Sequence, residues 1–146
     1  MKRVLFVEAS TGGVVGGSLT GLYHLIRGLH GGGWAASMVL YERKAIEPAL
    51  ADLGVPVFHL HRRRIPKEHA LLTHAGYHRA KRVRPIASGL HTLRQSARLL
   101  VEEIPAAARL VAIIGRVRPD VVHLGNGVRA NFDGILASLI ARRPIV

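Results

Sequence analysis

The start of the chain passes from a short apolar run through a glycine-rich stretch into a helical pattern. Residues 4–7 are all apolar, which is typical of a parallel strand covered on both faces, and Glu8 ends the run. Apolar residues then recur at helical spacing and predict one inward helix face: Leu19, Leu22, Ile26 and Leu29. The opening is therefore predicted to be a buried strand, a loop and an amphipathic helix.

Further strand patterns follow, separated by helical ones. After the first strand, strands are predicted at residues 34–41, 55–60 and 121–124, and a fifth begins at residues 145–146. Pro56, near the start of its strand, favours an edge position. Strands that alternate with helices in this way predict an α/β fold with a doubly wound parallel sheet and right-handed crossovers.

The helical patterns between these strands differ in length. They cover residues 45–53, residues 85–117 and a segment from about residue 131. Pro105 is predicted to kink the long middle helix or to begin a second one. Its apolar face is predicted to hold Leu90, Leu93, Ala97, Leu100, Val101, Ile104, Val111 and Ile114. The inward residues of the last helix are predicted to be Phe132, Ile135, Leu136 and Leu139.

The loop after the first strand is the first candidate for chemistry. It contains Gly12, Gly13, Gly16 and Gly17, and Ser18 is predicted to be the N-cap of the helix that follows. Backbone N–H groups beside a helix N-terminus favour an anion such as a phosphate. The alternative is a tight connection that binds nothing. A P-loop is excluded because no lysine precedes Ser18, and Thr11 stands where the dinucleotide fingerprint requires glycine.

Composition narrows the class of protein. A length of 146 residues with 49% hydrophobic residues fits one globular domain. The absence of cysteine excludes disulfides and cysteine-ligated zinc, and fits a reducing cytoplasmic location. The apolar run that stops at Glu8 is too short for a signal peptide, and no stretch has the roughly 20 apolar residues of a membrane span.

Positive charge is the most unusual feature of the composition. The 21 lysines and arginines outnumber the 9 acidic residues, so the net charge is +12 and anionic partners are favoured. Much of this charge lies in residues 62–84, a basic insertion in the predicted domain. Its cations are Arg62, Arg63, Arg64, Lys67, Arg79, Lys81, Arg82 and Arg84.

Two interpretations of the basic insertion stay open. It is predicted to face an anionic membrane surface, as basic amphipathic segments do. The alternative is a solvated excursion from the domain. Nucleic acid is not an expected partner, because Tyr77 is the only aromatic residue of the insertion and a stacking platform is therefore lacking.

The order of these segments resembles the N-terminal domain of a family 4 glycosyltransferase of the GT-B fold. The matching stretches are the opening RVLFVEASTGGVVGGSLTGLYHLIRGL, the strand WAASMVLYE, the segment DLGVPVFHL and the block RPDVVHLGNGVRANFDGILASLIARRPIV. The resemblance covers nearly all of residues 1–146 apart from residues 62–84. It implies a Rossmann-like, acceptor-side half of the fold.

The resemblance also implies where the site lies. The cleft near the donor phosphates and the acceptor would hold Gly12, Gly13, Gly16, Gly17 and Ser18. Asn126, Arg129 and Asn131 would be the acceptor-side candidates, although turn and cap roles explain the asparagines equally well. Many family members have His-x-His after the fourth strand. This chain has His123-Leu124-Gly125, so no catalytic residue is assigned.

The activity implied is sugar transfer from a nucleotide-sugar co-substrate to an acceptor hydroxyl, on a lipid-linked or polysaccharide acceptor. No metal and no resident cofactor are expected. The C-terminal nucleotide-sugar domain of the family is absent from residues 1–146, so the sequence is predicted to be truncated and inactive alone. One alternative is a non-catalytic α/β module that binds a phosphorylated ligand or an anionic membrane surface. A nucleotide-dependent oxidoreductase is disfavoured by Thr11 and the long glycine loop.

Overall fold

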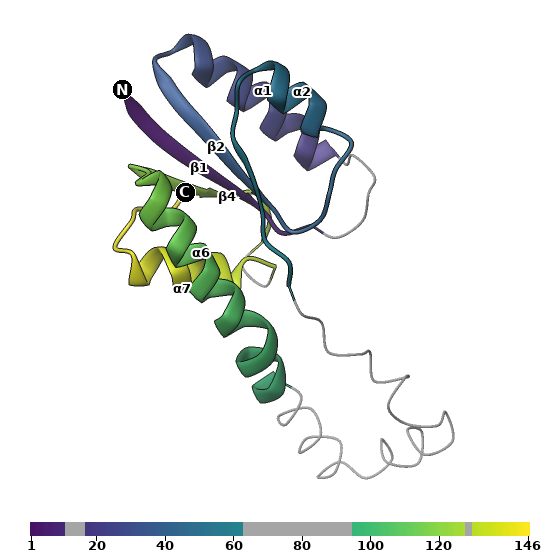
Figure 1. Ribbon diagram of the computed structural model, residues 1–146, viewed down its shortest axis with the longest axis vertical. Helices are drawn as coiled ribbons and strands as arrows, with labels where there is room; N and C mark the ends of the chain where they lie inside the picture. Colours follow the sequence, from purple (N-terminus) through teal and green to yellow (C-terminus); the bar gives the residue numbers. More distant parts are fainter. Residues whose placement is uncertain (11–16, 63–94, 128–129) are drawn as a thin grey trace, which may run out of the picture. The chain divides into compact units, whose positions relative to one another are not determined.

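The computed structural model describes residues 1–10, 17–62, 95–127 and 130–146 (Figure 1). Along the chain the elements are β1 (Lys2–Glu8), α1 (Gly17–Gly31), β2 (Trp34–Leu40), α2 (Glu47–Asp52), β3 (Val57–His59), η1 (Leu99–Glu103), α6 (Ile104–Val117), β4 (Val121–Leu124) and α7 (Phe132–Ile140). The chain forms two compact units, residues 1–61 with 106–146, and residues 62–105.

The first unit is built on a parallel sheet with the strand order β3-β2-β1-β4. Ile145 forms a further parallel bridge to Val122, where the sequence predicts the start of a fifth strand. Pro56 precedes β3, which is an edge strand as expected. The parallel α/β prediction is confirmed, and the carboxyl ends of the strands consequently lie at one edge of the sheet.

Helices cover both faces of this sheet (Figure 1). Helices α1 and α2 lie on one face, where Phe6 and Met38 are at the centre of a buried core with Leu19, Leu22, Ile26 and Leu50. Helices α6 and α7 lie on the other face, over a core built around Leu5, Val7, Leu110, Ile114 and Val122. Val4 and Phe6 of β1 therefore pack in one of these cores, and Leu5 and Val7 pack in the other. Burial on both faces is what the continuous apolar run predicts.

Helix α1 confirms the predicted element with a shifted start. The helix begins at Gly17, so Ser18 is its second residue and not the N-cap. The predicted inward residues Leu19, Leu22 and Ile26 are buried. After the helix ends at Gly31, Gly33 adopts a φ of 78°, a left-handed conformation that glycine reaches without the Cβ clash of other residues.

Helix α7 confirms only part of the predicted inward face: Leu136 packs against the core and Ile135 is half-buried. Phe132 and Leu139, expected to point inward, are 42% and 64% exposed. The buried residues are instead Asp133, Gly134, Ala137 and Ser138. A Cβ on Gly134 would lie 2.9 Å from Cδ2 of Leu124, so the helix backbone approaches β4 closely. Small residues permit this approach, and the hydrophobic pattern alone does not reveal it.

Residues 95–117 are helical throughout, so Pro105 neither ends the helix nor separates it into two; a π-helical segment precedes the proline instead. The π-helical segment η1 ends at Glu103 and α6 begins at Ile104, one residue before the proline. Leu100, Val101 and Ile104, which the pattern places inward, are exposed, whereas α6 buries Ala106, Ala107, Leu110 and Ile114. The extra residue in a π turn rotates the helix face by about a quarter of a turn.

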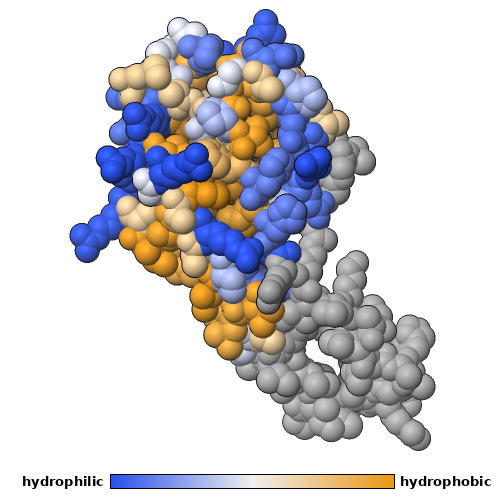
Figure 2. Space-filling view, in the orientation of Figure 1, coloured by the Kyte–Doolittle hydropathy of each residue, from blue (hydrophilic) through white to orange (hydrophobic). Residues whose placement is uncertain are grey.

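Exposed apolar side chains gather on the described end of the second unit, as Figure 2 shows for the face in view. They belong to Leu99, Leu100, Val101 and Ile104. Among the residues that the structure describes, no helix has the length and apolar character needed to cross a membrane.

Candidate functional site

Several predicted site residues lie outside the described part of the structure. These are Gly12, Gly13, Gly16 and Arg129, and the side chain of Ser18 is likewise not described. The basic residues Arg63, Arg64, Lys67, Arg79, Lys81, Arg82 and Arg84 also lie outside it. The site is therefore built from Gly17, Asn126, Asn131 and the described residues around them.

Arg62 departs from its predicted membrane-facing position. Its guanidinium forms an ion pair with the carboxylate of Glu103, and its side chain is only 12% exposed. Arg98 contacts the same carboxylate, with Nη2 2.9 Å from Oε1. Burial in water-poor surroundings favours such pairing, so this arginine neutralises an internal acid and does not present its charge at the surface.

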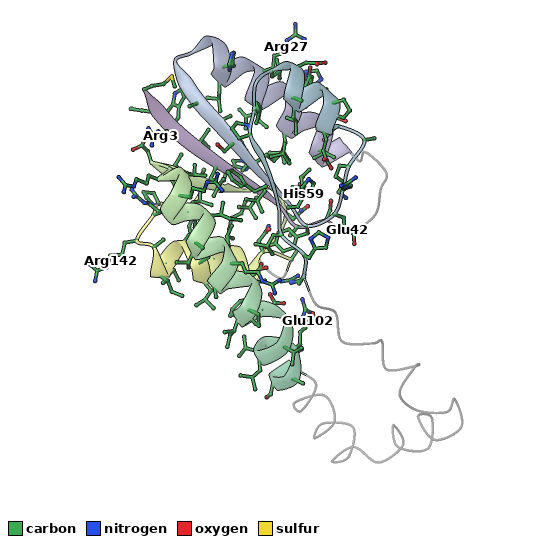
Figure 3. The ribbon with its side chains drawn as sticks, viewed as in Figure 1. Arg3, Arg27, Glu42, His59, Glu102 and Arg142 are labelled. Carbon is green, nitrogen blue, oxygen red and sulfur yellow. The ribbon has the colours of Figure 1, made fainter. Side chains whose placement is uncertain are left out.

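Several polar side chains of the first unit lie at the carboxyl edge of the sheet. Figure 3 labels Glu42 and His59 at this edge; Glu42 is two residues beyond β2, and His59 is the last residue of β3. His59 Nε2 lies 3.2 Å from Oε2 of Glu47 on α2. Strand ends in a parallel sheet converge in this way, and ligands of open α/β sheets bind at this edge.

Glu8, the last residue of β1, is the centre of a hydrogen-bonded cluster. Its carboxylate oxygen Oε1 accepts a hydrogen bond from the Ser10 backbone N–H at 2.9 Å and another from Asn126 Nδ2 at 2.5 Å. Glu8 is completely buried. The single carboxylate oxygen thereby joins the segment after β1 to the loop after β4.

The other oxygen of this carboxylate is not satisfied. Within the described residues, Glu8 Oε2 is buried and has no hydrogen-bond partner. The groups beside it include Gly125 and a methyl group of Leu22: a Cβ built on Gly125 would lie 2.7 Å from Oε2 and 2.9 Å from Leu22 Cδ1. Neither offers a polar hydrogen to Oε2, and an unpaired buried acceptor is costly.

Gly125 makes room for this carboxylate. The N–H of Gly125 donates to the Val7 carbonyl at 2.9 Å and continues the register of β4 beside β1, which brings residue 125 next to Glu8. A side chain at position 125 would overlap the carboxylate.

Asn131 is the N-cap residue of α7, but its side chain does not cap the helix. Its side chain makes no capping hydrogen bond; Nδ2 donates instead to the Asn126 carbonyl at 2.5 Å. A carbonyl can only accept, so this contact orients the amide and leaves Oδ1 as an acceptor. Asn131 is fully buried, and Oδ1 has no partner among the residues that the structure describes. The capping explanation of this asparagine is therefore wrong.

Two further buried groups support the edge. Lys44, in the segment between β2 and α2, places its ammonium 3.3 Å from Oγ of Ser10. Tyr41 donates to Oδ2 of Asp133 at 2.6 Å and ties the end of β2 to the first turn of α7. Oδ1 of the same aspartate accepts from the Gly134 N–H at 2.9 Å. These contacts hold the ends of β1, β2 and α7 against one another.

His123 lies one position before this edge, within β4. Its ring is tilted against Phe6 with 5.1 Å between centroids. Its Nδ1 is buried without a partner in the described structure, and desolvation lowers the pKa of the imidazole below the usual 6.5. A neutral, half-buried histidine packed against Phe6 fits these contacts.

This lowered pKa predicts a pH effect on stability. The unfolded chain takes up a proton near pH 6.5 and folded His123 does so only at lower pH, so its contribution to stability falls as the pH drops below about 6.5. Replacing His123 with phenylalanine should reduce the loss of unfolding free energy between neutral and mildly acidic pH in urea titrations. Exposed His24 on α1 provides the control variant. Equal pH dependence of wild type and the His123 variant would contradict the prediction.

Sequence reasoning missed Glu8 and Lys44 as members of the edge. The position of Glu8 could have been predicted from the sequence, because it ends the apolar run of the strand that precedes the glycine-rich loop. Lys44 stands 34 positions from Ser10 in the chain, so only the sheet order brings the two together. Asn126 and Asn131 were identified, but their link to Glu8 depends on the pairing of β1 with β4.

No protein-family model matches the sequence, and neither does any curated protein. Solved structures do match. Anabaena HepE (Alr3699), crystallised with UDP and glucose, is 19% identical with a TM-score of 0.58 over 99% of this chain and 29% of its own. MurG from Acinetobacter baumannii is 13% identical, with a TM-score of 0.60 over 99% of this chain and 34% of its own length. A glycosyltransferase from Rickettsia africae ESF-5 is 12% identical, with a TM-score of 0.59 over 99% of this chain and 28% of its own length.

These similarities concern the fold. The chain spans about a third or less of the length of each of these structures. Its parallel sheet with helices on both faces is the Rossmann-like architecture that the GT-B resemblance implies. The protein thus has the α/β fold of a GT-B glycosyltransferase domain.

Proposed function

We propose that this chain is the acceptor-side half of a family 4 type GT-B glycosyltransferase, which transfers a sugar from a nucleotide-sugar to an acceptor hydroxyl. The supporting observation is the match of 99% of the chain to part of HepE, whose crystal structure holds UDP and glucose. The buried polar cluster of Glu8, Asn126 and Asn131 lies at the sheet edge where ligands of such folds bind.

In the proposed reaction, the oxygen of an acceptor hydroxyl attacks the anomeric carbon of the donor. A new carbon–oxygen bond forms, the bond to the diphosphate breaks with its electron pair on the leaving group, and the hydroxyl proton passes to the departing diphosphate or to water. Backbone N–H groups of the glycine-rich segment would stabilise the developing negative charge, as preorganised donors do. The second, nucleotide-sugar domain would complete the cleft, so residues 1–146 alone are expected to be inactive.

The experiment compares the 146-residue chain with the complete natural reading frame that contains it. We expect the complete protein to release nucleoside diphosphate from a nucleotide-sugar in the presence of an acceptor, and the 146-residue chain to release none. A reading frame without a second α/β domain, combined with tight binding of inorganic phosphate by the chain alone, would instead favour the non-catalytic binding module.

Membrane association is a further part of the proposal. Residues 62–84 carry eight cations against one acid, and the apolar side chains of Leu100 and Ile104 are exposed in the same unit. Cytoplasmic protein is therefore expected at the inner face of the membrane, held by anionic lipid headgroups.

Sedimentation with liposomes tests this. Vesicles with anionic lipid should retain the chain and neutral vesicles should not, because each basic residue near the surface contributes about 1 kcal/mol of attraction. Replacing Arg79, Lys81, Arg82 and Arg84 with glutamine should abolish retention, whereas replacing the internally paired Arg62 should change it little. Equal retention by neutral vesicles contradicts electrostatic attachment.

A further inference from the structure

The cluster at the ends of β1 and β4 contains two buried oxygen atoms that lack donors. Glu8 Oε2 and Asn131 Oδ1 are both unpaired in the described structure, and their side chains are fully buried. They are connected through Asn126, whose Nδ2 donates to Glu8 Oε1 and whose carbonyl accepts from Asn131 Nδ2. Buried acceptors without donors indicate a missing hydrogen-bond partner.

The chemistry of this cluster restricts that partner. A phosphate or another anion would be repelled by the negative charge of the Glu8 carboxylate, and the carboxylate and the amide oxygen both accept hydrogen bonds without donating any. A cation would be repelled by the net charge of +12. The Lys44 ammonium also lies 3.3 Å from Oγ of Ser10, whose backbone N–H donates to Glu8 Oε1. A neutral hydroxyl donates without carrying charge, and it is small enough to reach a buried oxygen.

We propose that Glu8 Oε2 binds a hydroxyl group of a neutral, sugar-like acceptor, with Asn131 Oδ1 as the second acceptor of hydrogen bonds from the same ligand. This rests on the proposed function, and it distinguishes the β1–β4 edge from the phosphate-binding role expected of the glycine-rich segment. Glu8 acts as a binding residue whose other oxygen, Oε1, positions Ser10 and Asn126.

The substitution Glu8→Gln tests the role of the unpaired oxygen Oε2 separately from that of Oε1. Oε1 would keep its two donors, because turning the amide over would set its N–H groups against the Ser10 N–H and Asn126 Nδ2. The atom in the position of Oε2 would then be a nitrogen, which donates and cannot accept. The substitution therefore removes the charged acceptor to which the ligand hydroxyl would donate, and it leaves the intramolecular hydrogen bonds of Oε1 in place.

The test is an NMR titration of the 146-residue chain with methyl glucoside, methyl galactoside and N-acetylglucosamine as neutral probes, and with inorganic phosphate as the anionic probe. A sugar probe should shift the amide resonances of Glu8, Asn126 and Asn131 at millimolar concentration. Glu8→Gln should weaken this binding by about tenfold, the value of one hydrogen bond to a charged group. Phosphate should leave these three resonances unchanged.

Two variants complete the design. Glu47→Gln changes an acid at the same edge that pairs with His59, and it should leave sugar binding unaltered. Asn131→Ala removes the second free acceptor and should weaken binding as well, which keeps the test valid if Glu8→Gln unfolds. Circular dichroism verifies the fold of each variant.

Three results would overturn the proposal: no sugar probe shifts the cluster resonances, as when an ordered water satisfies Oε2; phosphate displaces the sugar; or both Glu8→Gln and Asn131→Ala bind as tightly as wild type. The outcome is separable from that of the proposed function. Sugar binding without turnover in the complete protein would support the hydroxyl site and contradict the transferase, and turnover that is insensitive to Glu8→Gln would do the reverse.

Discussion

Replacing Leu110 with alanine is expected to lower the free energy of unfolding by about 2–5 kcal/mol, the usual cost of removing a fully buried leucine side chain. Leu110 lies on α6 and belongs to the core with Leu5, Val7 and Val122 under it. The truncation removes apolar contacts from the layer that covers one whole face of the sheet. Urea unfolding followed by circular dichroism measures the change.

Leu139→Ala is the matched control for this experiment. Leu139 is the same residue type in a helix on the same face of the sheet, but its side chain is largely exposed. Its truncation should change the unfolding free energy by less than about 0.5 kcal/mol, as is usual at the surface. Similar losses in the two variants would contradict the packing of α6 and α7 described above.

Gly125→Ala is expected to destabilise the protein by about 1–3 kcal/mol, the typical cost of adding a methyl group to a closely packed position. The new Cβ would lie 2.7 Å from Glu8 Oε2 and 2.9 Å from Leu22 Cδ1, so the carboxylate must move. Movement would strain the hydrogen bonds that Oε1 receives from Ser10 and Asn126. Thermal and urea unfolding both report the loss.

The chain supplies a control two residues away. Among the described residues, nothing lies within 4 Å of a Cβ built on Gly127, so Gly127→Ala should be nearly neutral. Shortening the acid by Glu8→Ala in the Gly125→Ala background should recover part of the loss, which a double-mutant cycle measures. A Gly125→Ala protein as stable as wild type would mean that the carboxylate does not occupy this position.

The strands were predictable because a buried parallel strand leaves a local signal. Residues 121–124 were identified with the observed bounds of β4, and the apolar run at residues 4–7 lies within β1. The edge position of β3 followed from Pro56, which lacks an N–H to donate. Each of these features depends on a few consecutive residues, and the local pattern is sufficient for them.

The packing of α7 could not be read from its hydrophobic residues. Phe132 and Leu139 are large apolar residues that the helical pattern places inward, but their side chains are exposed. The inward face is set by Gly134, which allows close approach to Leu124, and by the hydrogen bond between Tyr41 and Asp133. The partners in these contacts come from distant parts of the chain, and a helical pattern contains no information about them.

The amino-acid sequence by itself determined the parallel α/β architecture, the glycine-rich segment after β1 and the large positive charge, because strand runs, helical spacing and composition are local properties. Only the tertiary structure decided that Glu8 occupies the space left by Gly125, that Asn131 orients its amide toward Asn126, and that Arg62 neutralises Glu103. Those arrangements depend on the pairing of β1 with β4 and on helix packing, which place side chains together that are far apart in the chain.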